Sequence, residues 1–201
     1  MKPSEMKQIV NMLYNEWNLG KKEAKAKGKI CAWIYLFEVL EETEKVVLEK
    51  EKNKVIGMCG YSKRNSKKYI LRKKFFKLLK NICINSPLIK DKKAIIKYSQ
   101  DYDYTPAELK NHFDGEISLL IVDKKYRGKG IGQKMINKTF EYAKKDNMKN
   151  IEIRTDESCN FKFYEKCGCK KIYEKDILNG EPDILGNITS EKGYIYEKIF
   201  N

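Results

Sequence analysis

Three glycines at alternate positions follow a short apolar segment in the middle of the chain, with two cations among them. The residues are Arg127, Gly128, Lys129, Gly130, Ile131 and Gly132, and Gln133 comes next. Glycines let the backbone approach a ligand closely and turn its N–H groups toward it. A helix that begins here adds free N–H donors and a partial positive charge, which favour phosphate. The pattern predicts a binding site for a phosphate-bearing ligand.

The spacing excludes two familiar phosphate-binding motifs. A Walker A loop has four residues between its glycines and then Gly-Lys-Ser/Thr, and a dinucleotide fingerprint reads G-x-G-x-x-G. The turn in this chain reads G-x-G-x-G. It therefore belongs to a different kind of anion-binding turn.

Such a turn needs a strand before it and a helix after it. Residues 116–122 are mostly apolar and β-branched, which is typical of a buried strand. Apolar residues then recur with a helical period from Ile131 to about residue 143, and the segment ends near Asn147. A strand at about 151–155 and a short helix at about 159–167 follow, and Gly168 is expected to end that helix.

This order of elements, together with its motifs, resembles the GCN5-related N-acetyltransferase (GNAT) family. Arg127, Gly130 and Gly132 match the family's R-x-x-G-x-G, and residues 160–168, NFKFYEKCG, are similar to its second motif. The resemblance covers about residues 115–173. It implies an α/β fold with a mixed, mostly antiparallel central sheet, a splayed strand pair and flanking helices. It also implies acetyl-CoA as co-substrate and no metal.

The resemblance further implies which residues contact acetyl-CoA. The pyrophosphate would lie on the backbone of Arg127 to Gln133, and the pantetheine arm would pair with the strand edge at Ile121 and Val122. A backbone N–H at that edge would polarise the thioester carbonyl. Asn160 resembles a cofactor-contacting asparagine, although it could equally cap the helix that begins there. Tyr164 matches the position that often protonates the leaving thiolate; the alternative is a core tyrosine.

Several residues could deprotonate or bind the attacking amine. Glu116 matches a general-base glutamate of histone-type members, and the period of two predicts that it shares a strand face with Val122. Its rivals as base are Asp101, Asp103 and His112. Carboxylates and tyrosines in residues 101–104 could hold a cationic amine by charge and cation–π attraction, although a surface turn explains them equally well. The expected substrate-binding residues are Asp101, Asp103, Tyr104 and His112.

The positive charge of the chain is concentrated in one segment. The 201 residues carry a net charge of +14, while residues 62–100 hold thirteen Lys or Arg and one acid. We interpret residues 62–114 as a basic insert within a single domain of residues 1–201. Its residues 70–82 form a basic amphipathic helix, whose apolar face is expected to pack on the domain. Contact with a membrane surface or with nucleic acid is the alternative.

Composition also limits the compartment and the metal chemistry. No stretch approaches the ~20 apolar residues that a membrane span needs, and no signal pattern opens the chain, so a cytoplasmic protein is expected. The six cysteines are interpreted as reduced and structural. Cys167 and Cys169 are too close for a zinc pair, and His112 is the only histidine.

The remaining elements are read from periodicity and turn residues. Ser4 is expected to cap a helix at about 5–19, and a charged link leads to a second helix at about 29–41. Strands are expected at 45–51, 55–61, 169–175 and 193–200, with a long loop over 176–192. The strand that usually precedes the family's first helix is missing or vestigial here.

The functional hypothesis is transfer of an acetyl group from acetyl-CoA to a primary amine, by direct attack in a ternary complex. A small-molecule amine is the leading acceptor, and a protein or peptide amine is the next. The alternative class is a non-catalytic module that senses acyl-CoA or binds RNA, although nucleic acid is not the expected partner. The chain could act as a monomer or a homodimer.

Overall fold

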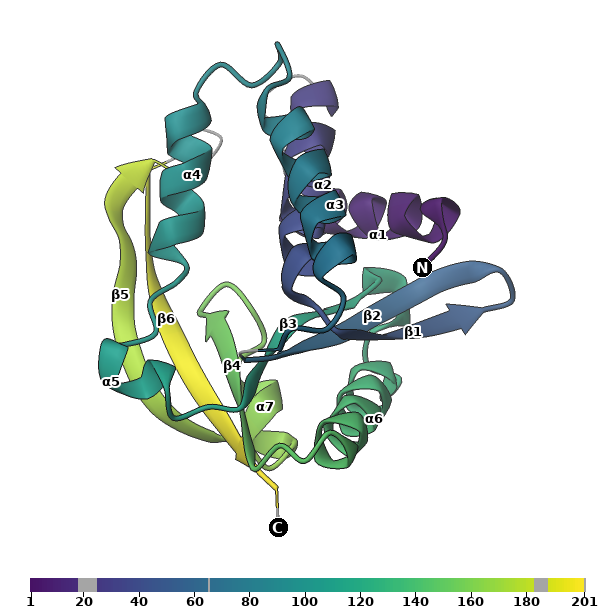
Figure 1. Cartoon of the computed structure of the whole chain (residues 1–201), viewed down its shortest axis with the longest axis vertical. Coiled ribbons are helices and arrows are strands. Elements are labelled where there is room, and N and C mark those ends of the chain that lie inside the picture. The colour runs from purple at the N-terminus through teal and green to yellow at the C-terminus, as the bar shows by residue number, and fades with distance from the viewer. Residues whose placement is uncertain (18–24, 65, 183–187, 201) are drawn as a thin grey trace.

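A six-stranded sheet forms the centre of the molecule (Figure 1). The structure is a computed structural model that describes residues 1–17, 25–64, 66–182 and 188–200, with side chains described there except at 94, 98, 101, 178–182 and 188–190. The strand order is β1-β2-β3-β4-β6-β5, and every neighbouring pair is antiparallel except β3–β4. The strands are β1 (Lys45–Glu51), β2 (Lys54–Lys63), β3 (Gly115–Val122), β4 (Asn150–Asp156), β5 (Lys170–Pro182) and β6 (Ile188–Ile199).

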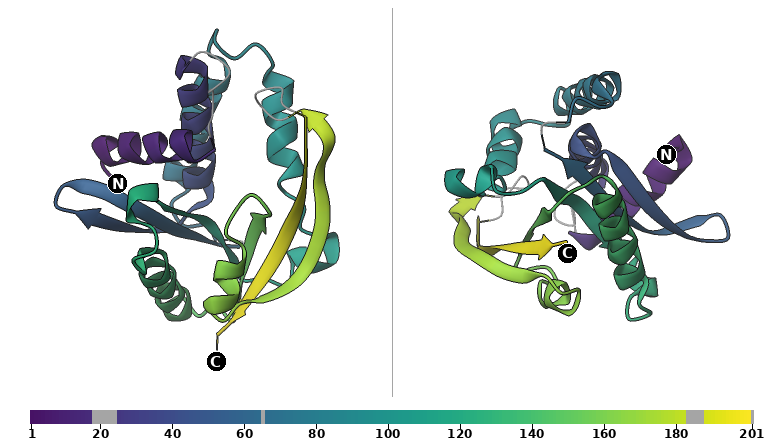
Figure 2. Two further views of the ribbon diagram at one scale, coloured as in Figure 1. Left: turned by 180° about the vertical axis from the view of Figure 1, so that it is seen from behind. Right: turned by 60° about the horizontal axis from the view of Figure 1, so that its bottom comes forward.

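Helices cover both faces of the sheet (Figures 1 and 2). On one face α1 (Pro3–Glu16) and α2 (Lys25–Glu42) pack on apolar side chains of β2 and β3, among them Leu119 and Ile121. On the other face α6 (Ile131–Lys145) packs on β2, β3, β4 and β6. The two apolar cores therefore lie on opposite faces of the sheet.

The parallel strands β3 and β4 separate early. They pair at Glu116 and Glu152 and then diverge, which confirms the predicted splayed pair and the mostly antiparallel sheet. The register between β2 and β3 also shifts, because Gly60 faces Leu119 while Tyr61 faces Ile117.

Ser118 is therefore the extra residue of a β-bulge, and a bulge reverses the alternation of side chains beyond it. Glu116 faces the α2 side of the sheet, whereas Val122 packs with the α6 core. The prediction that Glu116 and Val122 share a face is wrong for this reason.

In its described residues the insert contains three helices, α3 (Ile70–Ile84), α4 (Lys92–Asp101) and α5 (Ala107–Lys110). The helix predicted over residues 70–82 is present as α3, but its predicted apolar face does not pack on the domain. Leu71, Phe75 and Leu78 are exposed, and α3 meets α2 through Phe76 and Lys80 instead. Lys80 turns inward because Glu38 and Glu41 of α2 supply its counter-charges.

Other boundaries differ from the sequence prediction. The first described helix begins at Pro3, so Ser4 is not its cap; the Glu5 carboxylate accepts a hydrogen bond from the Lys2 backbone N–H instead. No strand precedes it in the described residues. The second helix extends back to Lys25.

The prediction of a loop over residues 176–192 is wrong for the residues that the structure describes. There β5 and β6 continue as a hairpin through Asp176, Ile177 and Glu191. The polar side chains of this hairpin resemble a loop in sequence, but main-chain pairing and the buried side chain of Ile177 maintain its strands. The short helix after β4, α7, spans Lys162–Lys166, and Gly168 follows it with φ of +72°, as predicted for a helix end.

Candidate active site

The glycine-rich turn joins β3 to α6 and leaves its backbone donors free. Gly128 and Gly130 both have φ of +75°, and Gly130 is the N-cap of α6. Within the described residues, no backbone N–H from Gly128 to Gln133 donates to a protein acceptor. A Cβ added at Gly128 or Gly130 would point into open space, with no atom within 4 Å. The turn therefore exposes a run of donors at a helix N-terminus, which is the arrangement an anion requires.

The third glycine has a different role. Gly132 lies inside the first turn of α6, where an added Cβ would meet the Phe163 ring at 3.5 Å and Val122 at 3.7 Å. Those are ordinary contact distances, so the protein itself does not require glycine there. The backbone conformation demands glycine only at the first two positions of the motif.

The cations of the turn are partly engaged by the protein. The Arg127 guanidinium donates to the Val122 carbonyl at 3.1 Å and pairs with Glu16 of α1. The Lys129 ammonium lies over the Tyr126 ring, 5.4 Å from its centroid. Lys129 is therefore the cation of this pair that could turn toward a bound phosphate.

The strand that leads into the turn has one open edge. Ile121 and Val122 pair with Met58 and Gly57 of β2, while β4 has already diverged on the other side. The edge predicted for the pantetheine arm is thus present as an unpaired strand edge beside the turn.

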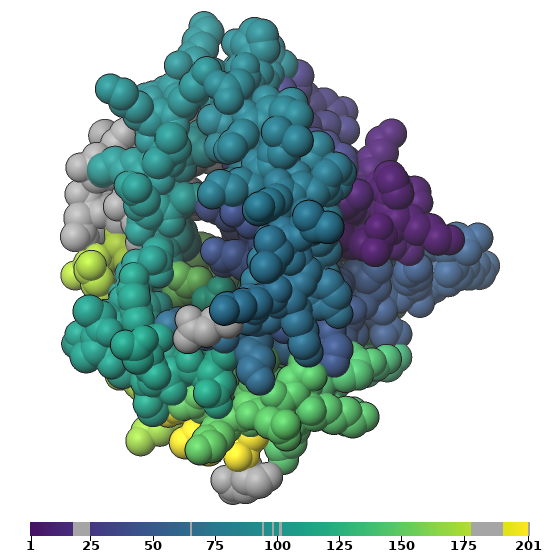
Figure 3. Space-filling model, viewed as in Figure 1, coloured from purple at the N-terminus to yellow at the C-terminus, as the bar shows by residue number. Residues whose placement is uncertain are grey.

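A cavity of about 970 Å³ opens from the point where β3 and β4 separate. Its walls come from α2, β3, β4 and the insert, and Figure 3 shows an opening between α3 and α4. Of the residues predicted from the sequence, Glu116, Asp103, Tyr104 and Tyr164 all line it. The structure thus brings together residues that lie up to 61 positions apart in the chain.

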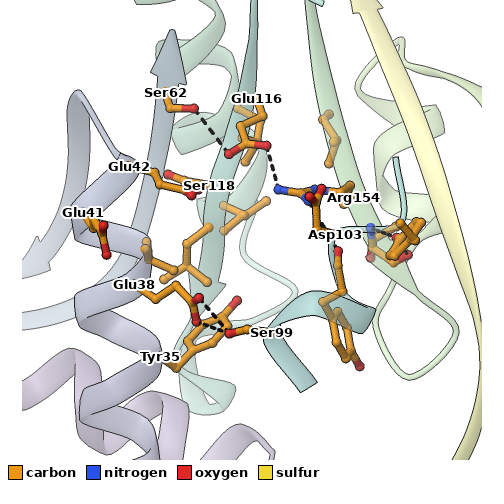
Figure 4. A pocket seen from close by; sticks show the side chains of 18 of the residues that line it. Tyr35, Glu38, Glu41, Glu42, Ser62, Ser99, Asp103, Glu116, Ser118 and Arg154 are labelled. Carbon is orange, nitrogen blue, oxygen red and sulfur yellow. Dashed lines mark hydrogen bonds and ion pairs between the residues drawn. The ribbon is translucent and has the colours of Figure 1, made fainter. Parts of the chain in front are cut away.

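Three carboxylates of α2 also line this cavity, and the sequence analysis missed them. Glu38, Glu41 and Glu42 lie near the end of the helix at i, i+3 and i+4; Glu38 and Glu42 point toward β3, whereas Glu41 lies on the side of the helix away from it (Figure 4). The Glu38 carboxylate accepts from the Ser99 hydroxyl of α4 at 2.7 Å, which links the two walls of the cavity. The sequence signal that could have revealed them is the presence of three acids at helical spacing at the end of an otherwise apolar helix.

Arg154 of β4 crosses the gap between the splayed strands. Its guanidinium donates to Glu116 at 2.7 Å and to Asp103 at 3.0 Å (Figure 4). This cation keeps both carboxylates paired at one end of the cavity.

Glu42 lacks such a partner among the described ion pairs, although it lies beside Glu116. Burial away from water and the neighbouring Glu116 charge raise the pKa of the Glu42 carboxyl from 4.5 to about 7. Glu42 and Glu116 thus form a carboxyl pair in which one member exchanges a proton near neutral pH.

Tyr164 belongs to α7 and also lines the cavity. Its ring packs against Phe163 and Tyr196, with centroids 5.5 Å and 5.7 Å away. Burial raises the pKa of the Tyr164 phenol well above its usual 10, so the group stays protonated at neutral pH. A protonated phenol at this place can donate a proton or a hydrogen bond.

The remaining predicted residues lie elsewhere. The His112 Nε2 is 2.6 Å from Glu197 and is not among the cavity-lining groups, and Asn160 is exposed without capping α7. The Tyr104 hydroxyl is held between the backbones of Thr155 and Tyr194, so Tyr104 forms part of the wall. The Asp101 side chain lies outside the described residues. The described residues contain no group of three or more His, Cys, Asp or Glu that could hold a metal.

Comparison with known proteins agrees with this geometry. Residues 94–169 match the model of a family described as Acetyltransferase (GNAT) family. An uncharacterized N-acetyltransferase of Methanocaldococcus jannaschii is 36% identical over 67 residues, which make up 32% of this chain and 28% of that protein. The alignment therefore spans little more than a quarter of that relative's length.

Two solved structures show the same fold over nearly the whole chain. The crystal structure of PH1933 from Pyrococcus horikoshii has a TM-score of 0.55 and 17% identity, covering 100% of this chain and 94% of that one. An N-acetyltransferase from Staphylococcus aureus has a TM-score of 0.54 and 15% identity, covering 99% and 94%. Residues 94–169 thus match the GNAT acetyltransferase family, and the predicted fold class of the chain is confirmed.

Proposed function

We propose that the protein transfers an acetyl group from acetyl-CoA to the primary amine of a small molecule, by direct attack in a ternary complex. One observation carries this proposal. The free N–H groups of the turn and a large cavity with carboxylates meet at the same splayed strand pair. An anionic nucleotide and an amine can therefore approach one point from two sides of the sheet.

The residues present fit acetyl-CoA. The donors from Gly128 to Gln133 suit a pyrophosphate, and the open edge at Ile121 and Val122 suits the amides of a pantetheine arm. Acetyl-CoA supplies an activated thioester when bound.

The amine must lose a proton before its nitrogen can form a bond to the acetyl carbon. We assign this proton to the Glu42–Glu116 pair, because Arg154 already occupies Glu116 at 2.7 Å while Glu42 accepts a proton near pH 7. The predicted general base, Glu116, thus acts together with a second carboxylate of α2. Asp103 would hold other positive groups of the acceptor, since it lines the same cavity.

The carbon–sulfur bond breaks as the carbon–nitrogen bond forms, and the thiolate needs a proton. Tyr164 is the proposed donor, because its phenol is protonated and lines the cavity beside the strands. The proton taken from the amine and the proton given to sulfur are thereby held by different groups. Water can restore both groups afterwards.

A small acceptor is favoured over a peptide by the way the cavity is walled. Glu38 of α2 and Ser99 of α4 are hydrogen bonded across it, and Tyr104 closes a further side. A cavity of about 970 Å³ is in the range that small-molecule sites occupy. A protein substrate would have to thread a flexible terminus into this space.

Release of free thiol from acetyl-CoA, measured with a panel of amines, tests the proposal. Small polyamines, aminoglycosides and amino acid derivatives form one arm of the panel, and peptides with free N-termini or lysines form the other. We expect turnover with the small amines and little with the peptides. Tight CoA binding without turnover on any acceptor would instead indicate a sensor and refute the enzyme assignment.

A further inference from the structure

The outward face of α3 bears a stripe of exposed apolar side chains. Leu71, Phe75, Leu78 and Ile82 are 83%, 54%, 57% and 59% exposed. Their spacing of i, i+4, i+7 and i+11 places them along a single line of the helix. Single exposed apolar residues are ordinary on protein surfaces, but a contiguous row of large ones marks a contact site.

The opposite face of the same helix is already occupied. Phe76 stacks on Phe37 of α2 with centroids 6.1 Å apart, and Lys80 pairs with Glu41 at 2.9 Å. The stripe therefore points away from the body of the molecule. Figure 3 shows α3 as a ridge on the face turned to the viewer, and the right-hand view of Figure 2 shows it standing clear of the sheet.

Unpaired lysines accompany the stripe. Lys67, Lys68, Lys74 and Lys77 are exposed, and none of them forms an ion pair within the part of the chain that the structure describes. They belong to the segment of residues 62–100, which holds thirteen cations and one acid. The surface around α3 is thus both apolar and strongly positive.

We propose that α3 docks on the surface of an anionic lipid bilayer. The apolar stripe would enter the boundary between headgroups and acyl chains, and the lysines would meet the lipid phosphates. The helix would lie in the plane of the membrane. None of the helices in the described ranges is long and apolar enough to cross a bilayer.

Charge and shape favour lipid over other partners. A second copy would bring its own α3 lysines against these, and like charges at a contact oppose association. Nucleic acid would meet Leu71 and Phe75, which offer nothing to a phosphate. The stripe lies on a convex ridge, and a fluid bilayer can close around a ridge without a matching groove.

Flotation of the full-length chain with vesicles tests this inference. One set contains phosphatidylglycerol and phosphatidylcholine, and the other contains phosphatidylcholine only. We expect binding to the anionic vesicles that weakens as salt is raised. The triple variant Leu71→Ser, Phe75→Ser and Leu78→Ser should bind at least ~tenfold more weakly, because it removes the side chains that insert.

Matched controls separate insertion from general effects. Ile199→Ser removes an apolar side chain that is 61% exposed but far from α3 in the chain, and should leave binding unchanged. Lys74→Gln with Lys77→Gln should weaken binding, whereas Lys138→Gln with Lys145→Gln on α6 should not. Circular dichroism and melting temperature show whether each variant is folded.

Three results would overturn the inference. One is failure of the wild-type chain to float with anionic vesicles. Another is binding that persists in the folded triple-serine variant, which would leave charge alone as the cause. The third is a wild-type dimer in light scattering that becomes a monomer in that variant, because the stripe would then be a subunit interface.

Discussion

Among single residues, Glu42 and Glu116 are the carboxyl groups that we propose to take the proton from the amine. Since Glu42 must be ionised to accept a proton, kcat/KM should rise with pH and level off above about 7. Glu42→Gln should lower kcat/KM by ~100-fold and remove this inflection. Glu41→Gln is the matched control, because Glu41 is engaged by Lys80 at 2.9 Å. A retained inflection in Glu42→Gln would assign the base elsewhere.

The same carboxyl pair also affects stability, but the free energy of unfolding should change with pH in the direction opposite to kcat/KM. The folded chain binds the Glu42 proton more tightly than the unfolded chain, whose glutamate has the ordinary pKa of 4.5. The free energy of unfolding should therefore fall as pH rises from about 4.5 to about 7 through this group. Glu42→Gln should make that fall smaller, as measured by denaturant titration at several pH values. An identical pH dependence in both proteins would contradict the raised pKa.

Tyr164 provides a second residue-scale prediction. Tyr164→Phe removes the hydroxyl and keeps the ring that packs on Phe163 and Tyr196. We expect kcat to fall by ~100-fold with little change in affinity for acetyl-CoA, since only proton donation is lost. The check is steady-state kinetics together with calorimetric titration of acetyl-CoA. An unchanged kcat would make Tyr164 a packing residue only.

At the scale of elements, the turn before α6 can be tested by filling the space beside Gly130. Gly130→Ala puts a Cβ where none of the described protein atoms lies within 4 Å, on the side open to the ligand. Affinity for CoA should fall about tenfold or more, because the pyrophosphate can no longer reach the N–H groups. The measurement is calorimetric titration of CoA.

Gly168→Ala is the matched control for that variant. Gly168 has φ of +72°, nearly that of Gly130, so both substitutions should cost about 1–2 kcal/mol of stability. Only Gly130 lies in the turn that we propose to bind the nucleotide. Equal losses of CoA affinity in the two variants would show that backbone strain, rather than ligand contact, is responsible.

The elements also show what could be read from the sequence. β3, α6 and β4 were predicted closely because period and turn residues are local signals. The bulge at Ser118 was not visible, since it arises from pairing with Gly60 and Tyr61 of another strand. Glu42 was missed for a similar reason, because its proximity to Glu116 depends on how α2 lies over the sheet. Tertiary contacts of this kind leave no periodic trace.

At the scale of the whole molecule, the insert forms a wall of the cavity and is tied to the sheet by Tyr104. Its hydroxyl donates to the Thr155 carbonyl at 2.7 Å and accepts from the Thr155 N–H at 3.1 Å. Tyr104→Phe should lower the free energy of unfolding by about 1–3 kcal/mol, because buried backbone groups lose a partner. Thermal denaturation measures this loss.

Tyr126→Phe is the comparison for Tyr104. The Tyr126 hydroxyl bonds Glu51 at the exposed surface, so its removal should cost less than about 0.5 kcal/mol. If Tyr104→Phe were equally mild, the insert would not depend on this contact. The basic composition of the insert was visible in the sequence, whereas its use of Tyr104 to close the cavity was not.

A crystal structure with CoA bound tests the central claim most directly. We expect the pyrophosphate within hydrogen-bonding distance of the backbone N–H groups between Gly128 and Gln133, with the thiol directed between β3 and β4 toward Tyr164. A nucleotide bound anywhere else on the molecule would contradict the proposed role of this turn.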